Sequence, residues 1–119
     1  MCAAYLYPNN TKISLGFANC LIADYKEIPN RSLVESCALE HAVDFGKLNS
    51  CISDTGHGED LLRDSVQRSK DTGVVFSCTV RLSDQIWCIR DSGRWKDCKG
   101  GSDPQDLIEE IKQRYKKFA

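Results

Sequence analysis

Cysteine content is the feature that most constrains what this chain can fold into. Seven cysteines lie scattered over 119 residues, at Cys2, Cys20, Cys37, Cys51, Cys78, Cys88 and Cys98. No pair has C-x-x-C spacing, which argues against a zinc ribbon and against a thioredoxin-type redox pair. Scattered cysteines in a small chain are typical of disulfide-stabilised proteins from oxidising compartments. We therefore expect a secreted protein, or one of the secretory pathway. Because seven is an odd number, one cysteine should have no disulfide partner within the chain.

Length and charge exclude several other classes. The chain is short enough to form a single domain over residues 1–119. Sixteen Lys and Arg residues against seventeen Asp and Glu residues give a net charge of -1, which argues against a nucleic-acid partner. No apolar run approaches the length of a membrane span, and the residues after Met1 do not resemble a signal peptide. Sequons at Asn9 and Asn30 agree with the secretory interpretation.

The first two thirds of the chain predict helices. Apolar residues at helical spacing indicate helices over 11–25, 32–42, 44–52 and 59–72. Ser32 and Glu35 have the spacing of a capping box at the start of the second helix. Asp44 can cap the third helix, and Gly73 can end the fourth.

The remainder of the chain changes to strand periodicity. Alternating apolar residues over 74–82 indicate a strand, which a short turn joins to a second strand over 86–90. A short third strand can follow over 94–98. Ser102 is expected to cap a last helix that continues to Phe118. The fold class is therefore α+β.

Spacing suggests two of the disulfides. Cys88 and Cys98 flank the turn at 91–93, so a returning strand would bring them together. A bond between Cys37 and Cys51 would join the second and third predicted helices. Cys2, Cys20 and Cys78 would then share one more bond and leave one odd thiol.

Two histidines are candidate catalytic or metal-binding residues. His41 could act with Cys37 or Cys51 as a nucleophilic pair, but structural cysteines are inert, and a packing role beside a disulfide is favoured. His57 stands between two glycines with no second histidine nearby, which favours a solvated loop over a metal site. We expect no catalytic residue, no metal and no cofactor.

The predicted hairpin carries a candidate binding patch. Arginine and lysine residues alternate there with tryptophans. Such side chains can contact a ligand, or they can simply pack against one another across the strands. The patch comprises Arg81, Trp87, Arg90, Arg94, Trp95 and Lys96.

Several segments resemble fungal members of the gamma-interferon-inducible lysosomal thiol reductase (GILT) family. The segments are CALE at 37–40, FGKLNSC at 45–51, LRDSVQRS at 62–69, SCTVRL at 77–82 and CIRDSGRWKDC at 88–98. The similarity runs from Cys2 to about Ile111. The resemblance implies a truncated thioredoxin-like fold, in which a helical segment is followed by a β-hairpin and a C-terminal helix.

Departures from the family determine the expected function. The resemblance implies a β-α-β unit with a C-x-x-C motif before the segments found here, and this chain does not contain it. Ser77-Cys78 stands where a thioredoxin-like enzyme has a cis-proline. We therefore expect a non-catalytic protein that binds a protein or receptor surface. A truncated piece of a thiol reductase is the first alternative, and a taste-active or storage protein of a fungus is the second.

A homodimer through the hairpin region is the expected assembly. Without the missing unit, a strand edge and an apolar face would lack neighbours, and a second copy could cover both. The odd cysteine could lock such a pair. The face comprises Val74, Phe76, Val80, Leu82, Leu107 and Ile111.

Overall fold

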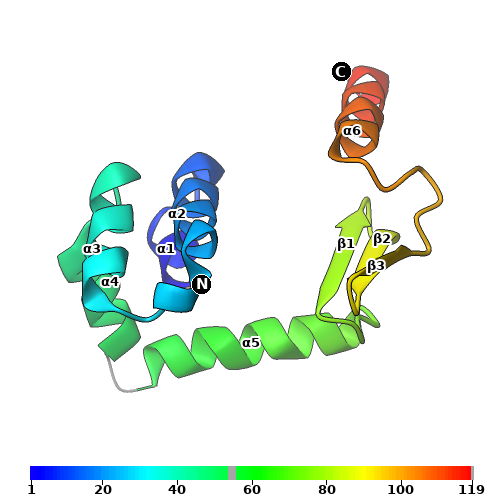
Figure 1. The fold of residues 1–119 in the computed structure, drawn as a ribbon. Helices are drawn as coiled ribbons and strands as arrows, with labels where there is room; N and C mark the ends of the chain where they lie inside the picture. Colours follow the sequence, from blue (N-terminus) through cyan, green and yellow to red (C-terminus); the bar gives the residue numbers. More distant parts are fainter. Residues whose placement is uncertain (54–55, 119) are drawn as a thin grey trace. The chain divides into compact units, whose positions relative to one another are not determined.

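The computed structural model describes residues 1–53 and 56–118 and belongs to the α+β class (Figure 1). Its elements are α1 (Cys2–Leu6), α2 (Thr11–Ala23), a 3-10 turn η1 (Tyr25–Glu27), α3 (Arg31–Glu40), α4 (Phe45–Ser53), α5 (His57–Asp71), β1 (Cys78–Leu82), β2 (Gln85–Asp91), β3 (Arg94–Lys96) and α6 (Pro104–Phe118). The chain divides into two compact units, Met1–Val66 and Gln67–Ala119, and the boundary falls within α5.

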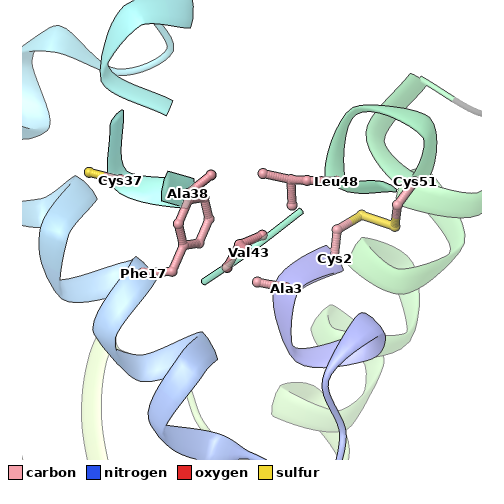
Figure 2. Close-up of a cluster of buried hydrophobic side chains, with 8 residues drawn as sticks. All are labelled: Cys2, Ala3, Phe17, Cys37, Ala38, Val43, Leu48 and Cys51. Carbon is pink, nitrogen blue, oxygen red and sulfur yellow. A yellow bond between two sulfur atoms is a disulfide. The ribbon is translucent and has the colours of Figure 1, made fainter. Parts of the chain in front are cut away.

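A small hydrophobic core holds the helices of the first unit together (Figure 2). Helix α1 packs against α2 and α4, and α3 packs against α2 and α4. Leu48 is 2 % exposed and Cys37 is completely buried. Burying a Leu side chain contributes about 1.5–3 kcal/mol, so few side chains carry much of the stability. The core residues are Cys2, Ala3, Phe17, Cys37, Ala38, Val43, Leu48 and Cys51.

Two disulfides cross the same core, and their pairing corrects one expectation. Cys2 is bonded to Cys51 and Cys20 to Cys37, with Cα separations of 6.0 and 5.7 Å. The expected bond between Cys37 and Cys51 is therefore wrong. It assumed that Cys37 faces the following helix α4, whereas α3 places Cys37 against the preceding helix α2. Helix α1 was not predicted, and it brings Cys2 to α4.

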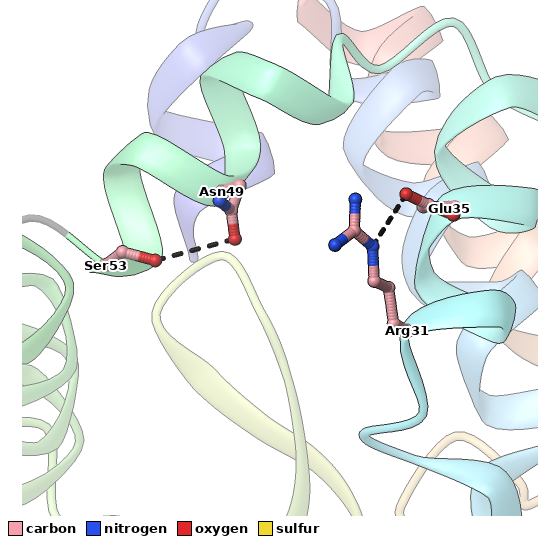
Figure 3. A network of polar contacts seen from close by, with 4 residues as sticks. All are labelled: Arg31, Glu35, Asn49 and Ser53. Carbon is pink, nitrogen blue, oxygen red and sulfur yellow. Dashed lines mark hydrogen bonds and ion pairs between the residues drawn. The ribbon is translucent and has the colours of Figure 1, made fainter.

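Local hydrogen bonds set the helix starts. The predicted capping box at Ser32 is wrong: α3 begins one residue earlier, and Glu35 pairs instead with Arg31, with Nε and Oε1 2.9 Å apart (Figure 3). Asp44 does cap α4, since the Lys47 amide donates to its Oδ1 at 2.9 Å.

The last helix also starts differently from the expectation. The amide of Gln105 donates to Asp103 Oδ1 at 2.9 Å, and the Asp103 amide donates to Asp106 Oδ2 at 3.2 Å. Asp103 is therefore the cap, in place of Ser102. Pro104 occupies the first helical position, where its missing N–H costs nothing.

The second unit contains an antiparallel sheet in the order β1-β2-β3. Both connections are two-residue turns with positive φ at each residue, 50° and 63° at Ser83 and Asp84, and 50° and 75° at Ser92 and Gly93. Such turns match the twist of a hairpin. The expected strand over 74–82 is too long: β1 starts at Cys78, opposite Arg90, and the residues before it have no strand partner.

Strand β3 and helix α5 also differ slightly from their expected bounds. Strand β3 ends at Lys96 rather than continuing to residue 98, because Asp97 has a φ of 54°. Helix α5 starts at His57, before the expected residue 59, and ends ahead of Gly73, whose φ of 74° suits a helix end. Among the described residues, no helix combines the length and the apolar character that crossing a bilayer requires.

Candidate functional site

The sheet brings Arg90 and Trp95 together on one face. They stand opposite each other in the register of β2 and β3, and cross-strand partners share a face. The Arg90 guanidinium carbon lies 5.1 Å from the centroid of the Trp95 ring, a cation–π distance. Trp95 is 45 % exposed, and Arg90 is exposed as well. The pair thus presents an aromatic ring and a positive charge to solvent.

An apolar cavity of about 140 Å³ lies beside Trp95. The sheet contributes one wall, and the loop before α6 with the first turns of that helix contributes the other. Its lining residues are Val80, Trp87, Cys88, Trp95, Gly101, Ser102, Asp103, Pro104 and Leu107. We call the Arg90–Trp95 pair together with this cavity the hairpin surface.

The loop wall of the cavity depends on a close approach and a disulfide. A Cβ atom built on Gly100 would collide with the Trp87 ring, so only glycine lets the loop lie against this half-buried side chain. Cys88 is bonded to Cys98, the pairing that the turn at 91–93 predicted. This bond fixes the start of the loop to the middle of β2.

The other predicted patch residues lie elsewhere in the unit. Arg94 and Lys96 flank Trp95 in β3, and alternation along a strand puts them on the opposite face. The Lys96 ammonium lies 3.4 Å from the centroid of the Phe76 ring and 3.6 Å from an oxygen of Asp91. The structure therefore divides the basic residues of the patch between two faces.

Arg81 and Trp87 are likewise engaged within the unit. Arg81 donates a hydrogen bond to the carbonyl oxygen of Asp84, 2.8 Å away, and so braces the hairpin turn. Trp87 is half-buried in the cavity wall. The cavity wall formed by the loop and by Leu107 was not predicted, although adjacent glycines at 100 and 101 are a signal of close backbone approach.

The cysteines considered as nucleophiles are not free thiols. Cys37 and Cys51 are both buried and both disulfide-bonded, so neither can pair with His41 as a thiolate. Within the described residues 1–53 and 56–118, Cys78 is the one free cysteine, and it is exposed on β1. His57 begins α5, where its ring meets the edge of Tyr5 with the centroids 4.6 Å apart.

Comparisons of the chain with protein-family models, curated proteins and solved structures find no match. The resemblance to the GILT family therefore stays a prediction, which depends on the segments quoted above.

Proposed function

We propose that this protein is a non-catalytic, disulfide-stabilised binding protein of the secretory pathway, and that the hairpin surface is where it contacts a protein partner. The observation that carries the proposal is the exposed Arg90–Trp95 pair next to an apolar cavity. Exposed tryptophan and arginine are the residue types that most often dominate protein interfaces. Three disulfides support the secretory part of the proposal, since such bonds persist in oxidising compartments.

The chemistry of the hairpin surface defines a class of partner. Among residues 1–53 and 56–118, no ion pair involves Arg90, so its guanidinium can receive a carboxylate from outside. The cavity beside Trp95 is almost wholly apolar and large enough for one aliphatic side chain. A peptide segment with an acidic residue next to an apolar residue would satisfy both features.

The proposed scaffold is a thioredoxin-like fold of the GILT type. The supporting observation is the element order of the structure, in which helices precede a hairpin and a final helix.

The first prediction concerns binding at the hairpin surface. Labelled short peptides that combine Asp or Glu with Leu or Phe should bind the full chain in a fluorescence anisotropy titration. Replacing Trp95 with Ala should weaken binding about tenfold, because it removes the ring and one cavity wall. The matched control is Arg94→Ala, one residue away on the opposite face, which should change affinity less than twofold.

The acidic character of the peptide provides the second comparison in that experiment. Peptides with Lys in place of the acidic residues should not bind. Equal losses from Trp95→Ala and Arg94→Ala, or no binding by any acidic peptide, would contradict the proposal.

Thiol reductase activity separates the proposed role from its first alternative. A dithiol reductase needs an activated thiolate and a resolving cysteine, whereas the exposed Cys78 is the one free thiol. Insulin turbidity with dithiothreitol should therefore proceed at the rate of dithiothreitol alone. A rate that rises in proportion to added protein, and that Cys78→Ser abolishes, would favour the reductase alternative.

We also propose that two copies associate through β1. This strand is an edge of the sheet and carries the exposed Cys78, so a two-fold axis beside it would bring two free thiols together. Light scattering at micromolar concentration should give twice the chain mass of 13.4 kDa. Val80→Lys should reduce the mass to that of one chain, while Cys78→Ser should leave a dimer without a covalent link. A wild-type mass near 13.4 kDa means that the association does not occur.

A further inference from the structure

One cluster of potential metal ligands surrounds the disulfide between α2 and α3. A carboxylate oxygen of Glu40, a ring nitrogen of His41 and the sulfur of Cys20 all lie within 4.8 Å of one another. The Cys20 sulfur is 3.6 Å from Glu40 Oε2. Since a disulfide sulfur carries no hydrogen, this approach is a contact and not a hydrogen bond. In the oxidised protein the carboxylate thus faces a sulfur that cannot donate to it.

The sequence places these groups together for simple geometric reasons. Glu40, the last residue of α3, and His41, which caps its end, follow Cys37 by three and four positions and so lie on the same side of the helix as Cys37. That side meets α2, where Cys20 is located. A Cβ atom on Gly16 of α2 would collide with the His41 ring, so glycine at this position is what lets the imidazole approach.

The ligand types match a zinc site. Thiolate, imidazole and carboxylate are the groups that bind Zn²⁺ in proteins, and bonds of about 2.0–2.3 Å hold tetrahedral ligands roughly 3.3–3.8 Å apart. The Cys20 sulfur and the Glu40 oxygen already lie in this range at 3.6 Å. Small side-chain rotations would bring in His41, since no pair in the cluster exceeds 4.8 Å. The one missing element is a free thiolate.

We propose that reduction of the Cys20–Cys37 disulfide creates a zinc site formed by Cys20, Cys37, Glu40 and His41. A phosphine reductant transfers two electrons to the sulfur–sulfur bond, takes up oxygen from water, and leaves two thiols. Zinc then displaces the two thiol protons and binds the sulfurs, the carboxylate and the neutral imidazole. The oxidised and zinc-bound forms exclude each other, because both use the same two sulfurs. This inference is independent of the hairpin surface and its proposed partner.

A single substitution exposes three of the four proposed ligands, Cys20, Glu40 and His41, without any reductant. Cys37→Ala frees the Cys20 thiol beside Glu40 and His41 and leaves the other two disulfides in place. All variants carry Cys78→Ser, so that no other thiol is available. Titration of the full chain with Co²⁺ should give one equivalent of bound metal, with thiolate-to-cobalt charge transfer and tetrahedral d–d absorption. The matched control adds His41→Asn, which should weaken Co²⁺ binding on the order of tenfold or more.

Two further measurements cover the case in which the loss of the disulfide unfolds the variant. Zinc binding should then restore a cooperative thermal transition, because a metal that binds the native state stabilises it. In the phosphine-reduced Cys78→Ser protein, Zn²⁺ should protect Cys20 and Cys37 from alkylation, and Glu40→Gln with His41→Asn should abolish that protection. Equal Co²⁺ binding with and without His41, or no binding and no zinc-dependent refolding, would overturn the proposal.

Discussion

The two disulfides of the first unit are the constraint on which the rest of that unit depends. Three of its eight buried core residues are cysteines, and the bonds tie α1 to α4 and α2 to α3. A loop closed by a disulfide of this kind stabilises a fold by about 2–4 kcal/mol, which is large for a core this small. The same bond between α2 and α3 also keeps Cys20 from acting as a ligand. The sulfur atoms of Cys20 and Cys37 thus serve either the stabilising disulfide or the proposed zinc site, but not both at once.

The second unit is held together less by a buried core than by tight turns and one disulfide. Its sheet is short, and Cys88 and Ile89 are its buried hydrophobic residues. Tight turns set the register of the strands, and the Cys88–Cys98 bond holds the following loop against β2. Because so little of this unit is buried, apolar and cationic groups remain available on its surface. Phe118 at the end of α6 is 88 % exposed.

Local sequence signals predicted part of the local structure, although the caps expected at Ser32 and Ser102 are wrong. The hairpin turns, the cap at Asp44 and the end of α5 all depend on residues close in sequence, and the Cys88–Cys98 bond closes a short loop. Pairing of the other cysteines failed because it depends on which helices pack together. The short α1, which brings Cys2 to Cys51, had no periodic signal long enough to detect.

The candidate site was predictable only in composition. The interleaved basic residues and tryptophans indicated the correct strands. The face of the sheet on which each side chain lies, however, depends on the strand register and on the alternation of side chains. A patch assigned from sequence therefore combined Arg90 and Trp95 with Arg94 and Lys96, which lie on the other face. Peptide mapping without reduction tests the disulfide framework most directly, after alkylation of free thiols. We expect linked peptides for Cys2–Cys51, Cys20–Cys37 and Cys88–Cys98, with Cys78 either alkylated or linked to Cys78 of a second copy. A peptide that links Cys37 to Cys51 would contradict this framework.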